Sequence, residues 1–303
     1  MSDYADHLGT ETFVSSQHEH PLPPIGFGTY QLPGIKCFES VKHAIENGYR
    51  HIDTAMAYDN ESAVGRAIAT SPVDRENLFV TTKIKGYPEY VTYNRILDET
   101  DGCLQRLGTE YIDLLLIHWW NSESDMEETF SALDDLVDEG IVRHIGVSNF
   151  SIDRLSRALA VADHPILTNQ IEYHPYWTQP ELLDFCRSHD VVITAYSPLA
   201  EGKLIHDPVL ATIGESYNKS AAQIAIRWLI QQEGIVTIPR STSLQHMREN
   251  IDVFDFTLTD AEMDRINSLK GPWWYRHNRE GGFVYTLRGI VGPVVNTVTP
   301  GSQ

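Results

Sequence analysis

The sequence predicts a (β/α)8 barrel, on three observations. Short apolar runs alternate with amphipathic segments along most of the chain, and this alternation is typical of parallel strands joined by crossover helices. The length of 303 residues and the hydrophobic fraction of 42% suit one large core. No linker rich in Pro, Ser or Gly divides the chain. A doubly wound sheet is the alternative, but no predicted strand is followed by Gly-x-Gly-x-x-Gly, of which Gly26-Phe27-Gly28 is only a fragment.

The predicted strands are apolar runs that end in polar residues. They lie within 25–30 and at 49–53, 77–83, 111–117, 142–147, 166–171, 190–196 and 234–238. The predicted helices alternate with them, at about 37–47, 60–69, 90–106, 125–138, 151–162, 179–188, 218–231 and 243–250. The helix after Ser220 is the clearest, because Ser220 and Gln223 have the spacing of a capping box and Gly234 lies past its end.

The two ends of the chain differ from the barrel, which we place at residues 24–270 of a single domain. Residues 1–23 are expected to form an N-terminal cap, with a small hairpin across the barrel bottom. Residues 271–303 are rich in Gly, Pro and aromatic residues, a composition that favours packing against another surface. We expect this tail to form a loop over the barrel mouth; partial disorder is the alternative.

Composition and charge exclude several classes of partner. A formal net charge of −19 repels phosphate backbones, which argues against nucleic acid. No run of about 18 apolar residues predicts a membrane span, and the N-terminus lacks the basic and apolar regions of a signal peptide. Three scattered cysteines (Cys37, Cys103 and Cys186) argue against a disulfide framework and favour a reducing cytoplasm. We expect a cytoplasmic monomer, with an oligomer as the alternative.

The balance of charged residues suggests a particular cytoplasm. Seven lysines stand against sixteen arginines and 42 acidic residues. High acidity with few lysines is expected where salt screens the repulsion between like charges. The sequence therefore favours a halophilic setting, and an ordinary acidic cytosolic enzyme is the alternative.

Four titratable residues stand at or just after the ends of three predicted strands. Asp53 ends the strand at 49–53, Tyr58 follows five residues later, Lys83 ends the strand at 77–83, and His118 follows the apolar run at 111–117. Singly, each has a structural explanation, such as a core histidine or a lysine that reaches the rim. Together they are expected to converge at one end of the barrel, where α/β barrels carry their catalytic residues.

At these residues the chain resembles the aldo-keto reductase family, from about residue 24 to residue 257. The motifs that carry the resemblance are Gly48-Tyr49-Arg50-His51-Ile52-Asp53-Thr54-Ala55, Tyr58 with Asn60-Glu61, Lys83 on its strand, Gly146-Val147-Ser148-Asn149-Phe150, and Ile238-Pro239-Arg240-Ser241. Several motifs in the same order make the match specific. The resemblance implies a (β/α)8 barrel with a catalytic tetrad of Asp53, Tyr58, Lys83 and His118.

Carbonyl reduction gives each member of this tetrad a role. The reaction needs a hydride on carbon, which only a cofactor can supply, and a proton on oxygen. Tyr58 can donate the proton, and the ammonium of Lys83 is expected to lower the pKa of the phenol from about 10. Asp53 is expected to hold Lys83 charged and oriented. His118 would position the carbonyl oxygen or share in proton delivery.

The resemblance also implies the cofactor contacts. Ser148, Asn149 and Gln170 correspond to residues that hold the nicotinamide carboxamide, and Tyr196 to the tyrosine that stacks on its ring. The remaining expected contacts are Gly28, Thr29, Tyr30 and Asp53 around the first strands, Ser197 and Leu199 at the pyrophosphate, Arg240 and Ser241 at the 2′-phosphate, and Glu249 and Asn250 at the adenine. Because arginine can bind a phosphate through two parallel hydrogen bonds, NADPH is favoured.

The sequence departs from the family pattern at three places. His246 stands where an arginine is usual, which keeps NADH as an alternative cofactor. Trp119 and Trp120 follow His118 where a proline two residues after the histidine is more usual; Trp119, Tyr30 and His118 are the expected substrate contacts. The tail does not match, so the sequence does not choose among sugar aldehydes, keto acids and small aldehydes.

Two other functions are alternatives to a reductase. A metal-dependent barrel hydrolase needs His-x-His at the end of the first strand and further ligands on later strands. The His-x-His at His18 and His20 precedes the first strand, so no metal site is expected. A non-enzymatic barrel that binds a nucleotide as a sensor would not need the tetrad.

Overall fold

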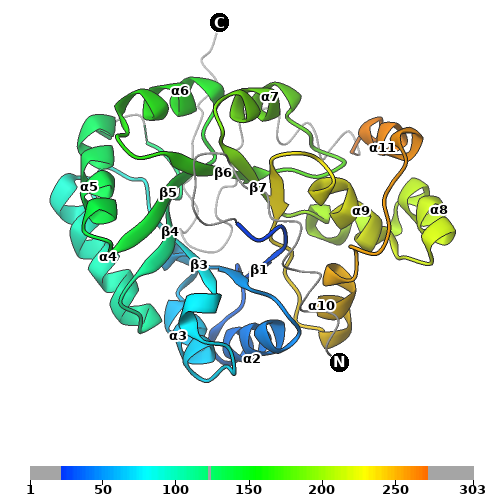
Figure 1. Ribbon diagram of the computed structural model, residues 1–303, viewed down its shortest axis with the longest axis horizontal. Helices are drawn as coiled ribbons and strands as arrows, with labels where there is room; N and C mark the ends of the chain where they lie inside the picture. Colours follow the sequence, from blue (N-terminus) through cyan, green and yellow to red (C-terminus); the bar gives the residue numbers. More distant parts are fainter. Residues whose placement is uncertain (1–21, 122–123, 272–303) are drawn as a thin grey trace, which may run out of the picture. The chain divides into compact units, whose positions relative to one another are not determined.

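The computed structural model describes residues 22–121 and 124–271. Eight parallel strands form one sheet in sequence order, and helices surround it (Figure 1). The strands are β1 (Gly26–Gly28), β2 (His51–Asp53), β3 (Phe79–Ile84), β4 (Ile112–Ile117), β5 (Val142–Ser148), β6 (Ile166–Glu172), β7 (Val192–Tyr196) and β8 (Ile235–Thr237). A parallel bridge between Ile25 and Thr237 joins the last strand to the first. The predicted (β/α)8 barrel is therefore confirmed.

The helices lie between the strands and after the last one. They are α2 (Gly34–Glu46), α3 (Glu61–Ala69), α4 (Tyr93–Leu107), α5 (Met126–Asp138), α6 (Ile152–Val161), α7 (Pro180–Ser188), α8 (Pro208–Tyr217), α9 (Ala221–Ile230), α10 (Leu244–Ile251) and α11 (Asp260–Asn267). The capping box of Ser220 and Gln223 starts α9 as predicted. None of these helices has both the length and the apolar character that a membrane span requires.

Two of the helices, α8 and α11, were not predicted. The alternation of strands and helices assigns one helix to each crossover, and both helices are additional to that pattern. Their start signals are nevertheless present in the sequence. Asp207 caps α8 through the backbone of Val209 and Leu210, ahead of Pro208. Thr259 and Glu262 form a capping box at the start of α11.

A cluster of buried apolar side chains connects five strands of the barrel. Leu22, which precedes β1, is fully buried and belongs to a cluster with side chains of five strands: Phe79, Leu114, Leu116, Leu167, Val192 and Val236. Burial of this kind contributes about 25 cal/mol per Å2 of apolar surface.

Both predicted end segments lie almost entirely outside the described residues. The hairpin expected within 1–23 is described only at Leu22 and Pro23, and the tail only at Gly271. Contacts divide the chain after Leu269, and the barrel belongs to the first part. The single domain and the loop over the mouth therefore stay predictions.

Candidate active site

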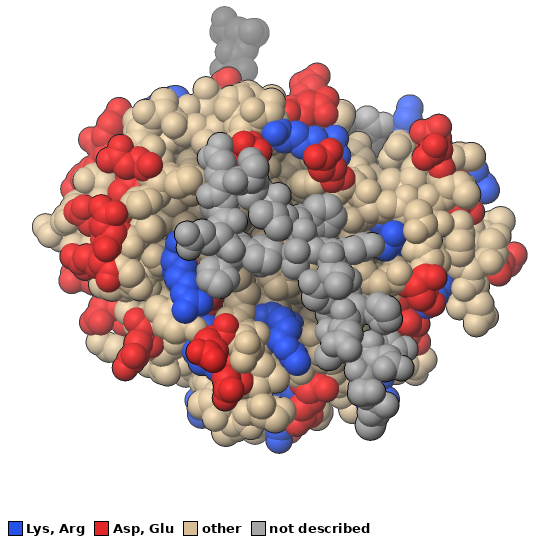
Figure 2. All heavy atoms as spheres, viewed as in Figure 1, with Lys and Arg blue, Asp and Glu red and all other residues tan. Residues whose placement is uncertain are grey.

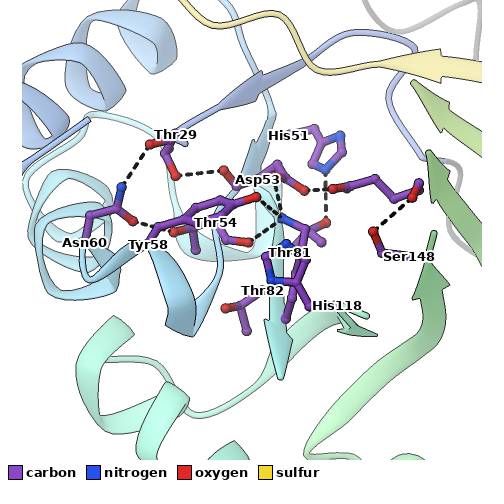
Figure 3. A network of polar contacts seen from close by, with 12 residues as sticks. Thr29, His51, Asp53, Thr54, Tyr58, Asn60, Thr81, Thr82, His118 and Ser148 are labelled. Atoms are coloured by element: carbon purple, nitrogen blue, oxygen red, sulfur yellow. Dashed lines mark hydrogen bonds and ion pairs between the residues drawn. The ribbon is translucent and has the colours of Figure 1, made fainter. Parts of the chain in front are cut away.

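A buried ion pair lies at the centre of the site. The ammonium of Lys83, on β3, is 2.6 Å from Oδ1 of Asp53 at the end of β2, and both residues are at most 1% exposed. Lys83 also donates to the carbonyl oxygen of Thr54 at 2.7 Å and to the hydroxyl of Tyr58 at 3.4 Å. The second oxygen of Asp53 accepts from the amide of Gln170 at 2.7 Å. Figure 3 shows Asp53, Thr54 and Tyr58 together in this network of polar contacts.

Tyr58 is held beside this pair by a short 3-10 helix, Met56–Tyr58, that ends at Asp59 in the left-handed conformation (φ 54°). Its ring centroid is 5.1 Å from that of Tyr30 and 5.5 Å from that of His118. Burial raises the pKa of Tyr58 well above its ordinary value, and the carboxylate of Asp53 raises it further. Tyr58 therefore keeps its proton at neutral pH.

This direction is opposite to our expectation that Lys83 lowers the pKa of Tyr58. Burial is the main cause, because it removes the water that would stabilise the phenolate; Asp53, 2.6 Å from the ammonium, also offsets the charge of Lys83. A neutralised pair cannot favour the phenolate as an isolated ammonium would.

His118 is the third group that faces the phenol. Its backbone N–H donates to the carbonyl of Ile84 at 2.8 Å, which joins the ends of β4 and β3. The imidazole is 5% exposed and stacks on the indole of Trp119 with 3.5 Å between ring centroids. Burial lowers the pKa of His118 well below its ordinary value, and the charges of Lys83 and Lys85 lower it further. The imidazole is therefore neutral at pH 7, and its Nδ1 has no hydrogen-bond partner among the described residues.

The predicted carboxamide contacts form a second group beside the ion pair. Ser148, at the end of β5, donates to the carbonyl of Gln170 at 2.9 Å and accepts from the amide of Asn149 at 3.0 Å. Asn149 takes a left-handed backbone conformation (φ 62°) and accepts from the hydroxyl of Tyr196 at 3.0 Å. The hydroxyl and two side-chain amides offer both donors and acceptors, which is the chemistry that a nicotinamide carboxamide requires.

The predicted phosphate contacts lie on loops after β7 and β8. Ser197 has φ 51°, so the chain turns sharply before Leu199. Arg240 is exposed and donates to the carbonyl of Tyr30 at 3.1 Å. Ser241 lies two residues before Ser243, which caps α10 through the backbone N–H of His246. A helix N-terminus and an exposed guanidinium both suit a phosphate group.

The other predicted contacts differ in how open they are. Thr29 is fully buried and donates to the carbonyl of Asp53 at 2.9 Å, and Gly28 packs on the backbone of Ile238. Tyr30 is 38% exposed. At α10, Glu249 accepts from Gln245 at 2.8 Å. Asn250 is only 4% exposed, so little of its side chain remains open to a ligand.

Sequence reasoning missed several residues that support the tetrad. Thr54 provides the carbonyl that binds Lys83, and its hydroxyl donates to Asn60 at 2.7 Å. Glu61 accepts from Thr82 at 2.5 Å and from Arg106 at 2.6 Å, behind β3. The sequence feature that could have identified Asn60 and Glu61 as supporting residues is their position in the motif that contains Asp53. Lys85 could have been identified because it lies two residues after Lys83, and residues at that spacing in a strand point to the same face.

No metal centre is present in the described part of the chain. Within residues 22–121 and 124–271, no group of three or more His, Cys, Asp or Glu side chains could hold a metal ion. His18 and His20 lie outside those residues.

Comparison with known proteins assigns the family. A family model described as "Aldo/keto reductase family" matches residues 24–270. The chain belongs to the aldo/keto reductase family. Aldo-keto reductases use nicotinamide cofactors, and the family assignment supports an oxidoreductase.

Individual relatives agree with this assignment. The chain is 43% identical to glyoxal reductase of Bacillus subtilis (strain 168) over 82% of its own length and 89% of that protein. It is 42% identical to 9,11-endoperoxide prostaglandin H2 reductase of Trypanosoma cruzi (strain CL Brener), over 82% and 88% of the two chains. A solved aldo-keto reductase from a Medee basin deep-sea metagenome library superposes with a TM-score of 0.79 at 40% identity, over 83% and 92%. Carbonyl reduction is the general chemistry that these similarities support.

Proposed function

We propose that this aldo-keto reductase reduces aldehydes or ketones to alcohols with NADPH, and that Tyr58 is the proton donor. The observation that carries the proposal is the position of the Tyr58 hydroxyl, 3.4 Å from an ammonium that is itself paired with Asp53. The nicotinamide, when bound, supplies the hydride to the carbonyl carbon. Everything else in the reaction falls to side chains of the chain.

Tyr58 and His118 are the two side chains that would donate hydrogen bonds to the carbonyl oxygen of the substrate. Their rings meet edge to face, with 5.5 Å between centroids, so we place the carbonyl oxygen beside the two rings, where it would accept from both. His118 is neutral and can donate a hydrogen bond without losing its proton. Tyr58 transfers its proton as negative charge develops on the oxygen, and Lys83, 3.4 Å away, donates a hydrogen bond to the phenolate that remains.

Asp53 acts through Lys83 and Gln170. Its two oxygens bind the ammonium and the Gln170 amide separately, so it links the proton donor to the group that would hold the carboxamide. This link fixes the distance between the proton donor and the carboxamide contacts, and catalysis depends on holding the reacting groups at a fixed distance.

The choice of NADPH rests on Arg240. Its guanidinium is exposed beside Tyr30. Its other N–H groups have no hydrogen-bond partner among the described residues, and they can bind a 2′-phosphate. His246, in the first turn of α10, would add charge there only when protonated. NADH is therefore the alternative, and substitution of Arg240 tests the choice.

The three cysteines are buried free thiols, which supports our proposal of a cytoplasmic location. Acidic side chains are spread over the outer helices on the face that Figure 2 shows. This distribution supports the halophilic interpretation, because dispersed like charges repel each other less in concentrated salt.

The test is cofactor oxidation with a panel of aldehydes and ketones, in wild type and Tyr58→Phe. Tyr58→Phe is expected to lower kcat by about 10^2- to 10^4-fold, the usual contribution of a general acid, while cofactor binding measured by fluorescence is retained. Tyr217→Phe, which removes a hydroxyl bonded to Glu262 on the far helix α8, is the matched control. Arg240→Ala is expected to weaken NADPH binding and to leave NADH binding unchanged. Cofactor binding without turnover of any carbonyl in wild type would instead favour a nucleotide sensor.

A further inference from the structure

Lys85 stands at the mouth of the barrel next to the proposed catalytic groups. It follows the last residue of β3 and is two residues beyond Lys83, so the alternation of the strand directs it to the same face. Its backbone N–H contacts Sδ of Met56 at 3.5 Å, in the short helix that carries Tyr58. Its ammonium lies 5.0 Å from the ring centroid of Tyr90.

Gly86, the residue after Lys85, packs closely against the segment that carries Trp119. A Cβ at Gly86 would collide with the carbonyl oxygen of Trp119, so only glycine permits the observed contact. The carbonyl of Gly86 also accepts from the backbone N–H of Asn121 at 3.1 Å. Lys85 is therefore held between the segment of Tyr58 and the segment of His118 and Trp119.

Lys85 is unusual among the few lysines of this acidic chain. Lys42, Lys83, Lys203 and Lys219 each lie within 4.0 Å of a carboxylate. Lys36 and Lys270 lie on the exposed surface. Within the described residues, Lys85 is the half-buried lysine without a carboxylate at that distance. A partly desolvated ammonium that has no counter-ion within the described part of the chain is costly.

Among the described residues, the neighbouring groups do not compensate the charge of Lys85. Lys83 and Asp53 cancel each other at 2.6 Å, and Tyr58 and His118 are both neutral at pH 7. The charge of Lys85 is close enough to lower the pKa of the His118 imidazole, so its field extends to where the carbonyl oxygen would lie. A negatively charged group on the substrate would complete the site.

We propose that Lys85 binds a carboxylate on the substrate, so that carbonyl compounds bearing a carboxylate are the favoured substrate class. A single ammonium acts as a point charge, which suits a monoanion, whereas phosphate sites usually add a bidentate arginine or several backbone N–H groups. The ring of Tyr90 beside the ammonium retains it in place without neutralising it. This inference rests on the proposed carbonyl reductase activity.

Two aldehydes of nearly the same shape test the proposal. 4-Carboxybenzaldehyde carries a carboxylate where 4-nitrobenzaldehyde carries a neutral group of similar size, and the 3-substituted pair varies the distance to the carbonyl. For the better acid isomer, Lys85→Met is expected to reduce kcat/KM about ten- to hundredfold, mainly through KM, which is the usual effect of losing a hydrogen bond to a charged group. The nitro compound should change by less than about twofold.

The controls separate charge from structure. Lys36→Met removes an exposed lysine of α2 and should affect neither aldehyde. Lys85→Arg should retain the discrimination. In wild type, molar KCl should reduce the discrimination between acid and nitro aldehyde, because salt screens the attraction; this measurement does not depend on how the variants fold.

Several results would overturn the proposal. Equal losses on both aldehydes in Lys85→Met, an unchanged kcat/KM for every acid, or a raised KM for NADPH alone would each exclude a carboxylate site at Lys85. If wild type reduces the nitro aldehydes without preferring an acid, this inference fails and the reductase activity stands. If wild type reduces no carbonyl compound, the proposed function fails and this inference with it.

Discussion

Replacing Asp53 with asparagine removes the counter-ion of a fully buried ammonium. At 2.6 Å, two unit charges attract by about 6 kcal/mol for an effective dielectric constant of about 20, which is an upper bound on the loss. Breaking a buried pair by removing one partner usually costs about 3–5 kcal/mol. The amide oxygen of asparagine can still accept from Lys83, so we expect Asp53→Asn to lower the free energy of unfolding by about 3 kcal/mol at pH 7.

The stability loss in Asp53→Asn should also depend on pH, through the pKa of Lys83. Burial lowers the pKa of Lys83 from its ordinary value of 10.5, while Asp53 raises it. Without Asp53 the folded-state pKa of Lys83 falls further. Between the folded and unfolded values the unfolded chain binds more protons, so stability rises with pH. The deficit of Asp53→Asn relative to wild type should therefore be greatest at neutral pH and shrink as the pH rises toward 10.5.

The assay is guanidinium unfolding at several pH values for wild type, Asp53→Asn, Lys83→Met and the double variant. The double variant should be more stable than the sum of the single losses implies, because it no longer buries an unpaired charge. Lys219→Met, whose lysine pairs with two more exposed carboxylates, is the control and should cost no more than about 1 kcal/mol. A deficit below about 1 kcal/mol at pH 7, or strictly additive losses, would refute the reasoning.

Two further predictions concern the mouth and the surface. Gly86→Ala should displace the backbone at Trp119, because an added Cβ collides with it. Small misplacements near a reacting centre are costly, so kcat/KM should fall by at least about tenfold. The control is Gly108→Ala, where a Cβ meets nothing; it should affect stability alone, and equal kinetics in the two variants would contradict the prediction. The net charge of −19 should make the unfolding midpoint temperature rise between low salt and molar KCl; an unchanged midpoint and activity would require another explanation of the acidic surface.

The sequence alone determined the barrel and the approximate place of the tetrad. Strand ends could be read because apolar runs stop where polar residues begin, and in a parallel barrel all such ends meet at one mouth. Asp53, Lys83 and His118 stand at three of these ends, so their convergence followed from the alternation of the elements. The additional helices α8 and α11 were missed because nothing in a repeating pattern predicts an insertion.

Only the tertiary structure decided the charge states and the contacts between distant segments. The amide of Gln170 reaches Asp53 across 117 positions of sequence, and Gly86 meets the Trp119 carbonyl on the neighbouring strand connection. The sequence suggested that Lys83 lowers the pKa of Tyr58, whereas burial and Asp53 raise it. The reason is physical: a pKa depends on desolvation and on distances of a few ångströms between charges, and neither quantity exists until the chain has folded.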